Sequence, residues 1–333
     1  MVRKMNNVLK DKTILLTGGT GSFGNKFTEI ALKEHSPKVI RIFSRGEKKQ
    51  VDMKKKFNDH EKLRFFIGDV RDKNRLNRAI NDVDVVIHAA AMKQVPVCEY
   101  NPIEAIRTNI DGCINVIDTA IDNNVEKVIF IGTDKAVHPI NLYSATKMTS
   151  EKLFIQGNSY RGIKNTKFSC VRYGNVIGSR GSVIPIFLNQ KKNNILTITD
   201  ESMTRFWIPL ERGVNFVIKS IERMKGGEIF IPKIPSMKII DLAKTIAPDA
   251  KIKIIGIRPG EKIHEILLTE DESRHSREFD DYYIIEPELE PKICFWKPLK
   301  SGKNLENGFR YTSESNNKWI TKDEITKIIE EFK

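Results

Sequence analysis

The sequence lacks a hydrophobic run long enough to cross a membrane. Its longest apolar stretch, near Val85–Met92, is interrupted by His88 and falls short of the about 18 residues that a spanning helix needs. The N-terminal segment Met1–Lys12 is basic but has no apolar core of the kind found in secretion signals. We therefore expect a cytoplasmic protein with no membrane partner.

Cysteine is also scarce, and no two cysteines form a C-x-x-C pair. The chain contains four: Cys98, Cys113, Cys170 and Cys294. This spacing argues against a disulfide framework, and we expect buried free thiols. His264 and Glu265 alone do not make a metal site, so we predict no bound metal and a structural role for that histidine.

Acidic residues are outnumbered by basic ones. The chain has 56 Lys and Arg against 43 Asp and Glu, a net charge of +13. A basic excess can indicate nucleic-acid binding. Here the basic residues are mixed with acidic ones, as in 52–56, and no base-reading motif occurs. We therefore expect no nucleic-acid partner and a basic surface that suits an anionic small substrate.

Short β-branched segments alternate with amphipathic segments through the first half of the chain. The predicted strands are Thr13–Thr17, Val39–Phe43, Leu63–Ile67, Val83–His88, Val128–Ile131 and Phe168–Arg172. The predicted helices are Asn25–Glu34, Lys48–Asn58, Asn74–Asn81, Pro102–Asn123 and Leu142–Ser159. This alternation predicts an α/β fold, a doubly wound parallel Rossmann sheet with helices on both faces.

The alternation weakens after Asn175, where glycine and proline become frequent. We predict a Rossmann domain over residues 1–174, to which a returning segment at about 208–232 adds a helix (Leu210–Met224) and a strand (Glu228–Ile231). Residues 175–207 and 233–333 are then expected to form a smaller C-terminal α/β lobe that binds the substrate.

A glycine-rich turn joins the first predicted strand to the first helix. Gly18, Gly21 and Gly24 are spaced G-x-x-G-x-x-G, with Thr20, Ser22 and Phe23 between them. Glycine permits a tight turn and a close approach of the backbone to pyrophosphate, whose charge is favoured at a helix N-terminus. In this strand–turn–helix context we predict that these residues bind a dinucleotide, rather than only forming a tight turn.

The ends of the next strands extend the predicted cofactor site. An acid after the second strand would favour NAD, but the chain has Ser44 and Arg45, with Lys49 one helical turn on. A hydroxyl and a guanidinium suit a 2′-phosphate, so we predict NADP; the alternative is a solvated arginine on a turn. Further predicted contacts follow the third and fourth strands: Asp69, Val70, Ala89, Ala90 and Ala91.

Two acid/base couples stand close together in the sequence. Tyr143 and Lys147 are four residues apart, on one face of a helix, and the ammonium is expected to favour the phenolate. The pair Asp134–Lys135 beside Thr133 is more than a plain alcohol dehydrogenase needs, which indicates loss of water after oxidation. The alternative is a helix-capping Asp134 and a surface Lys135.

Together these segments resemble the extended short-chain dehydrogenase/reductase superfamily, which acts on nucleotide sugars. The motifs are the glycine turn, Ala89–Ala91, Thr133-Asp134-Lys135, Tyr143-Ser144-Ala145-Thr146-Lys147 and Arg172-Tyr173-Gly174-Asn175-Val176. Segments 66–72, 176–183, 203–207, 226–238 and 255–262 are most similar to one branch, the inverting UDP-N-acetylglucosamine 4,6-dehydratases that begin pseudaminic acid synthesis. The likeness spans about residues 10–290. Gly46, Gln94, Gly132 and Ser144 depart from the branch, and Gln94 makes the sugar less certain than the reaction type.

The resemblance implies a mechanism with NADP and a UDP-N-acetylglucosamine substrate. Tyr143 removes the C4 hydroxyl proton, assisted by Thr133 and Lys147. Lys135 takes the C5 proton, which requires its pKa to fall, and Asp134 protonates the departing C6 hydroxyl. The implied substrate contacts are Lys93, Tyr173, Asn175, Val183, Arg205, Arg258 and Glu261.

The resemblance also implies a homo-oligomer, a dimer or hexamer. Two alternatives remain open at this stage. One is another nucleotide-sugar dehydratase or an epimerase, and the other is a dinucleotide-binding redox sensor without turnover.

Overall fold

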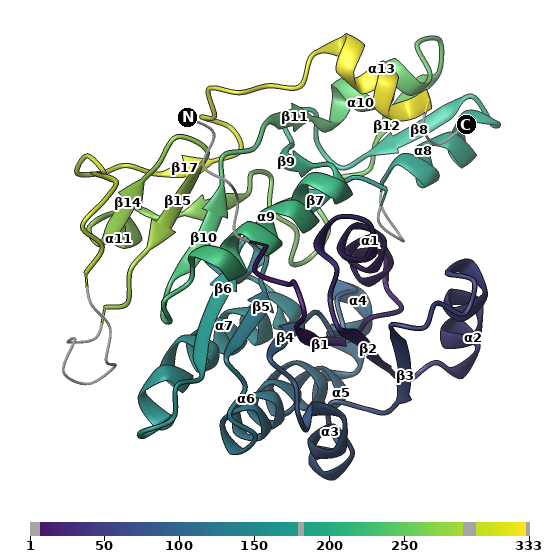
Figure 1. The fold of residues 1–333 in the computed structure, drawn as a ribbon. Helices are drawn as coiled ribbons and strands as arrows, with labels where there is room; N and C mark the ends of the chain where they lie inside the picture. The colour runs from purple at the N-terminus through teal and green to yellow at the C-terminus, as the bar shows by residue number, and fades with distance from the viewer. Residues whose placement is uncertain (1–6, 179–182, 289–297, 331–333) are drawn as a thin grey trace.

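The computed structural model describes residues 7–178, 183–288 and 298–330, and a ten-stranded sheet lies at its centre (Figure 1). Its strand order is β16-β14-β15-β10-β6-β5-β4-β1-β2-β3. The parallel part consists of β1 (Thr13–Thr17), β2 (Val39–Ser44), β3 (Leu63–Ile67), β4 (Val85–His88), β5 (Lys127–Ile131), β6 (Lys167–Val171) and β10 (Ile229–Pro232). This confirms the predicted doubly wound parallel sheet.

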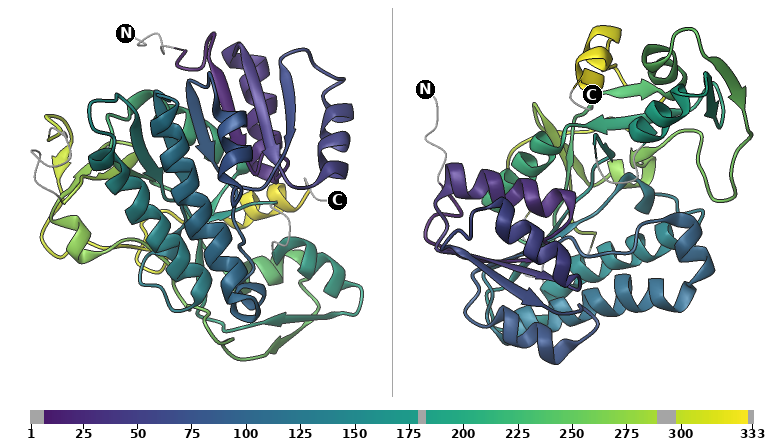
Figure 2. Two further views of the ribbon diagram at one scale, coloured as in Figure 1. Left: turned by 90° about the horizontal axis from the view of Figure 1, so that it is seen from below. Right: turned by 90° about the vertical axis from the view of Figure 1, so that its right-hand side faces the viewer.

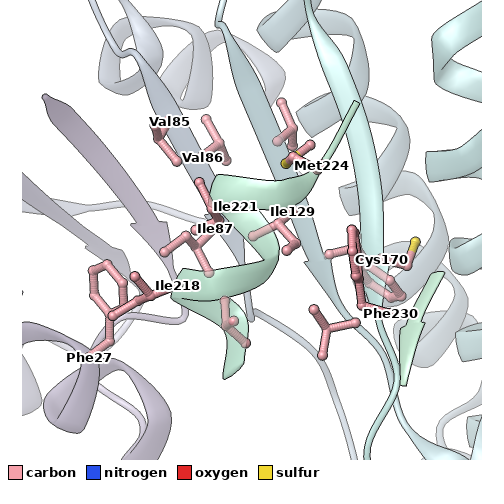
Figure 3. Packing of buried hydrophobic residues seen from close by; sticks show 14 of the residues in the cluster. Phe27, Val85, Val86, Ile87, Ile129, Cys170, Ile218, Ile221, Met224 and Phe230 are labelled. Atoms are coloured by element: carbon pink, nitrogen blue, oxygen red, sulfur yellow. The ribbon is translucent and has the colours of Figure 1, made fainter. Parts of the chain in front are cut away.

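Helices cover both faces of this sheet, so its central strands are buried throughout, as in β1. On one face lie α1 (Ser22–Ile30) and α9 (Leu210–Arg223). Figure 3 shows Ile218 and Ile221 of α9, and Met224 just after it, facing Ile87 and Ile129 of the sheet. On the other face lie α3 (Lys73–Ile80), α6 (Gly112–Asp122) and α7 (Leu142–Tyr160). The strand order reverses between β1 and β4, the position at which open α/β sheets bind ligands.

Most predicted elements of the first half agree with the observed ones except at their ends, but one predicted helix is interrupted and the short helix over Val95–Tyr100 was not predicted. The predicted helix over Pro102–Asn123 is interrupted: α5 (Pro102–Ile106) passes through a π-helical turn (Arg107–Asp111) before α6. A similar turn (Ala31–His35) follows α1. The remaining helices of this half are α2 (Glu47–Lys56) and α4 (Val95–Tyr100). The predicted returning helix and strand are α9 and β10.

A smaller lobe with its own hydrophobic core lies beside the carboxyl edge of the parallel strands (Figure 2). Trp207, Phe187 and Met237 lie in that core. Its elements are β7 (Asn175–Val176), α8 (Val183–Lys191), β8 (Ile195–Ile198), β9 (Thr204–Ile208), β11 (Ser236–Lys238), α10 (Ile239–Ile246), β12 (Lys251–Ile254) and α13 (Lys322–Glu330).

The C-terminal part of the chain also contributes to the large sheet. Strands β14 (Ser276–Glu278), β15 (Tyr282–Ile285) and β16 (Lys303–Asn304) extend it in antiparallel pairing from β10. Strand β13 (Ile266–Leu268) pairs with β17 (Tyr311–Thr312), and α11 (Glu270–Ser273) follows β13. The division into two domains stays a prediction. The predicted boundaries placed residues 233–333 in the smaller lobe, but β14, β15 and β16 of this segment belong to the large sheet.

Other features of the chain bear on the sequence predictions. In the described residues no helix is both long and apolar enough to cross a membrane. Cys98, Cys113 and Cys170 are buried free thiols, as predicted, whereas Cys294 and the motif residues 179–182 lie outside the described part.

Candidate active site

A cavity of about 980 Å³ opens along the carboxyl edge of the parallel strands, between the sheet and the smaller lobe. It gathers residues that follow β1, β2, β3, β4, β5 and β6, because the carboxyl ends of parallel strands meet at one edge. Every residue predicted to bind cofactor or substrate, or to act in catalysis, lines it except Gly24 and Asp134.

The glycine turn lies at one end of this cavity. Gly18 has a φ of +65°, and a Cβ there would lie 2.9 Å from the Ala90 backbone. A Cβ on Gly24 would lie 2.1 Å from the Gly19 carbonyl oxygen, so this glycine permits close packing instead of lining the cavity. Helix α1 begins at Ser22 without a side-chain cap. Its first N–H groups are therefore free to bind an anion such as pyrophosphate, which fits a dinucleotide.

A polar corner at the end of β2 follows the glycine turn. The Ser44 hydroxyl accepts a hydrogen bond from Gln50 Nε2 at 3.0 Å, an ordering contact that sequence reasoning missed. Arg45 has 61% of its side chain exposed, and its guanidinium lies 3.9 Å from Asp69. Lys49 lines the same corner. The corner therefore offers a hydroxyl and two cationic groups to a ligand.

Asp69 itself already has partners from the protein. Its carboxylate accepts hydrogen bonds from the Arg71 backbone and guanidinium, at 2.7–3.0 Å. Burial raises the pKa of Asp69, but the bonds from Arg71 lower it more, so the net pKa is below its usual value. The expected contact of this carboxylate with the cofactor stays a prediction.

The segment after β4 is held by a buried histidine that the sequence did not reveal as a positioning group. The His88 ring lies 2.7 Å from the Thr17 hydroxyl, which in turn accepts from the backbone N–H groups of Ala89 (3.2 Å) and Ala90 (3.3 Å). Burial lowers the pKa of His88 to about 3, so the ring is neutral. This chain of contacts fixes the small residues on the floor of the cavity.

The acid/base pair Asp134–Lys135 lies on a short 3-10 turn after β5. The Asp134 carboxyl is fully buried below the cavity, and its Oδ1 accepts from Thr133 Oγ1 (2.9 Å) and Lys135 Nζ (3.1 Å). Lys135 Nζ reaches the cavity and also lies 3.1 Å from Asn175 Oδ1 and 3.2 Å from Glu265 Oε1. Lys135 has 30% of its side chain exposed, and its ammonium has three oxygen acceptors within the protein.

The pKa of Lys135 shifts in the opposite direction from the one expected. Burial lowers it, as the sequence argument assumed, but the carboxylates of Asp134 and Glu265 raise it more, so the net pKa lies above its usual value. Burial raises the pKa of Asp134. Lys135 acts to lower this pKa, and Glu265 acts to raise it further. The sequence argument missed the second carboxylate because Glu265 comes from a distant segment.

The pair Tyr143–Lys147 also differs from the expectation. Burial raises the pKa of Tyr143 to about 12, although Lys135 and a hydrogen bond with Thr133 act to lower it. Lys147 Nζ donates to the Ile131 carbonyl oxygen at 2.8 Å and lies 3.9 Å from the centre of the Phe130 ring. Burial lowers the pKa of Lys147 to about 8. The protein's own groups therefore do not favour the phenolate, and the cation that acts to lower the pKa of Tyr143 is Lys135 instead of Lys147.

All predicted substrate contacts line the cavity: Lys93, Tyr173, Asn175, Val183, Arg205, Arg258 and Glu261. Arg205 is largely used within the protein, since its guanidinium donates to the carbonyl oxygens of Thr204, Lys262 and Ile263. Burial lowers the pKa of Lys93, and Lys135 lowers it further. His264 lies within hydrogen-bonding distance of Thr204 and Glu314, which agrees with its predicted structural role.

With this geometry in place, comparison with known proteins identifies the family. The sequence profile of the family described as "Polysaccharide biosynthesis protein" matches residues 14–287. The chain belongs to this family. The resemblance to extended short-chain dehydrogenases/reductases is thereby confirmed.

Individual relatives are similar along nearly their whole length. The chain is 53% identical to UDP-N-acetylglucosamine 4,6-dehydratase (inverting) of Campylobacter jejuni, over 96% of this chain and 97% of the relative. It is 48% identical to UDP-glucose 4-epimerase of Rickettsia conorii, over 83% of each chain. Among solved structures, Pen from Bacillus thuringiensis has a TM-score of 0.88 and 40% identity, covering 97% of this chain and 99% of that one.

Proposed function

We propose that this protein is a UDP-N-acetylglucosamine 4,6-dehydratase that inverts C5, using tightly bound NADP as a catalytic cofactor. The observation that carries the proposal is the Asp134–Lys135 pair beside Thr133 and Tyr143, at the cavity that the dinucleotide turn also lines. The high identity to a relative of that name supports the same activity. The product would be a 4-keto-6-deoxy-L-arabino sugar nucleotide, the starting compound for pseudaminic acid or a related sugar.

The cavity fits a nicotinamide dinucleotide, which when bound supplies a hydride acceptor for C4 and a hydride donor for C6. The uncapped α1 N-terminus and the tight turn that Gly18 permits suit its pyrophosphate. Ser44, Arg45 and Lys49 suit a 2′-phosphate, which supports NADP over NAD.

In the first step Tyr143 accepts the C4 hydroxyl proton. Its pKa of about 12 must fall for this role, and Lys135 and Thr133 already act in that direction. Oxidation at C4 acidifies the C5 hydrogen, which Lys135 removes as a neutral amine, and the raised pKa of Lys135 must fall for this role. The C5–H electron pair then forms the C5–C6 double bond as the C6–O bond breaks. The inverted product results when C6 receives the hydride and C5 receives a proton on the opposite face of the ring.

Asp134 supplies the proton that converts the departing C6 hydroxyl to water. Its carboxyl does not line the cavity, but its Oδ1 is 2.9 Å from the Thr133 hydroxyl, which does. We infer that the proton passes through this hydroxyl: the hydrogen bond that Thr133 donates to Asp134 Oδ1 reverses, Thr133 gives its own proton to the departing oxygen, and Thr133 takes the Asp134 proton in its place. The raised pKa of Asp134, caused first by burial, supports a protonated acid in this position.

Incubation with UDP-N-acetylglucosamine and mass spectrometry of the product test the activity. Loss of the mass of one water without net consumption of cofactor is expected, and NMR of the product should show inversion at C5. Unchanged mass with inverted C4 would instead indicate an epimerase, which the similarity to the rickettsial relatives keeps as the second candidate. No reaction with any nucleotide sugar would favour a sensor.

The cofactor preference has a separate test. NADP, not NAD, should be released on denaturing the purified protein. Arg45→Ala should weaken NADP binding about tenfold to 100-fold, the value of one hydrogen bond to a charged group, and leave NAD binding unchanged. Lys48→Ala is the matched control, since this neighbouring lysine does not line the cavity. Equal loss of NADP and NAD affinity in Arg45→Ala would contradict the assignment.

The assembly and location of the protein stay predictions. Light scattering after size-exclusion chromatography should show a homo-oligomer, a dimer or a hexamer. A cytoplasmic location is expected from the sequence argument.

A further inference from the structure

We propose that Glu265 is a positioning residue of the elimination step, whose carboxylate orients the Lys135 amine and controls proton binding by the Asp134–Lys135 pair. The inference rests on the proposed dehydration. Glu265 Oε1 lies 3.2 Å from Lys135 Nζ, and the Glu265 side chain is 3% exposed. It comes from the segment before β13, far from Lys135 in the sequence.

Glu265 is held firmly in this position. Its backbone N–H donates to the Ser313 hydroxyl (2.9 Å), and its carbonyl oxygen accepts from the Ser313 N–H (2.8 Å). Arg205 Nε is 3.6 Å and Lys262 Nζ 4.0 Å from its carboxylate. The carboxylate is thus fixed on its side of Lys135 by two cations and by the backbone.

The three oxygen atoms around Lys135 Nζ have different chemical capacities. Asn175 accepts a hydrogen bond but carries no charge, whereas Asp134 and Glu265 each add a buried negative charge. One oxygen of each carboxylate, Asp134 Oδ2 and Glu265 Oε2, is buried without a hydrogen-bond partner within the described residues. Burying a carboxyl oxygen without a hydrogen bond costs less free energy when the carboxyl group is neutral than when it is ionised. Burial therefore favours protonation of at least one of the two acids.

The surroundings decide which acid holds it. Burial acts to raise the pKa of Glu265, but Lys135, Arg205 and Lys262 lower it more, so Glu265 is the ionised member. Burial keeps the pKa of Asp134 raised although Lys135 acts to lower it. The ionised Glu265 therefore helps to keep Asp134 in the acid form that the departing hydroxyl requires. The same charge makes Lys135 harder to deprotonate.

This arrangement gives a prediction with a definite sign. Glu265→Gln keeps an oxygen acceptor near Lys135 but removes the negative charge. Loss of that charge lowers the pKa of both Lys135 and Asp134, by about 1–3 pH units for a charge at this distance. Both limbs of the pH–rate profile of elimination should therefore move to lower pH. The groups that face Lys135 and could share the effect are Asp134, Tyr143, Arg205, Lys262 and Lys93.

The primary experiment needs no substrate. The purified protein with its bound dinucleotide is labelled with trace acetic anhydride over a pH series, and peptide mass spectrometry follows acetylation of Lys135. Labelling in Glu265→Gln should rise at a pH at least about one unit lower than in the wild type. Glu314→Gln is the matched control, because this exposed carboxylate pairs with the neighbouring His264 and not with Lys135. Its labelling curve should equal that of the wild type.

A second variant keeps the test decisive if Glu265→Gln folds poorly, which dinucleotide content and thermal unfolding would reveal. Glu265→Asp retains the charge one carbon farther from Nζ, so its curve should lie between those of wild type and Glu265→Gln. Unchanged Lys135 labelling in a folded variant would overturn the inference. Failure of the wild type to release water from UDP-N-acetylglucosamine would instead overturn the proposed function, since labelling is read without substrate.

When substrate is added, oxidation at C4 and elimination of water can be followed separately. Transient absorbance of reduced cofactor reports oxidation at C4, and product mass reports elimination. Glu265→Gln should retain the first signal and shift only the pH profile of the second. A uniform fall of both signals at every pH would indicate a merely structural role and contradict the inference.

Discussion

Replacing Arg172 with methionine should lower the free energy of unfolding by about 3–5 kcal/mol. Arg172 follows β6, and its guanidinium is buried between Glu151 of α7 and Glu272 of α11. Its Nε lies 3.1 Å from Glu151, its two terminal nitrogens lie 2.9 and 3.0 Å from Glu272, and one of them donates to the Leu267 carbonyl oxygen at 2.9 Å. The side chain therefore joins α7 to the C-terminal segment.

The magnitude follows from what the substitution leaves behind. Glu151 has 2% of its side chain exposed, so its carboxylate would stay buried without a counter-ion, whereas Glu272 has 19% exposed and is partly hydrated. The loss in free energy of unfolding therefore comes mainly from the buried, unpaired carboxylate of Glu151 and not from the loss of two ion pairs. The double variant Arg172→Met with Glu151→Gln removes that charge, and it should be more stable than the single variant by about 1–3 kcal/mol.

Urea denaturation followed by tryptophan fluorescence measures both values at neutral pH. The comparison of single and double variants is the decisive part, because lost packing alone would make the double variant the less stable. A single variant within about 1 kcal/mol of the wild type, or a double variant no more stable than the single one, would refute the reasoning.

Further predictions concern catalysis, the glycine turn and pH. Tyr143→Phe should abolish the transient absorbance of reduced cofactor, whereas Lys135→Ala should keep that signal and lose dehydrated product; normal product from either variant would remove its assigned role. Gly24→Ala should lower dinucleotide retention more than tenfold, because its Cβ would lie 2.1 Å from a backbone oxygen; Gly213→Ala, whose Cβ would have its nearest neighbour at 3.8 Å, is the control. Burial lowers the pKa of His88 to about 3, below the value of about 6.5 in an unfolded chain. Between these two pH values the unfolded state therefore binds a proton on this ring and the folded state does not. Stability should therefore fall on acidification through that window, by up to about 1.4 kcal/mol per pH unit, and a flatter dependence of the urea midpoint is expected in His88→Leu.

Local patterns in the sequence were sufficient to predict the sheet, the dinucleotide turn and the residues that face the cavity. Strand–helix alternation and the spacing of Gly18, Gly21 and Gly24 express backbone geometry within a few residues, so they can be read without the fold. The carboxyl ends of parallel strands also meet at a single edge by necessity. The predicted residues of six strand ends therefore line one cavity.

Only the tertiary structure decided how those residues are charged and held. Glu265 reaches Lys135, and Glu272 reaches Arg172, from segments about a hundred residues away or more. Electrostatic interaction depends on separation in space and on burial, and neither is encoded in sequence spacing. For this reason the amine predicted to lose its proton easily has a raised pKa, and a carboxylate dismissed as a metal ligand adjoins the acid/base pair.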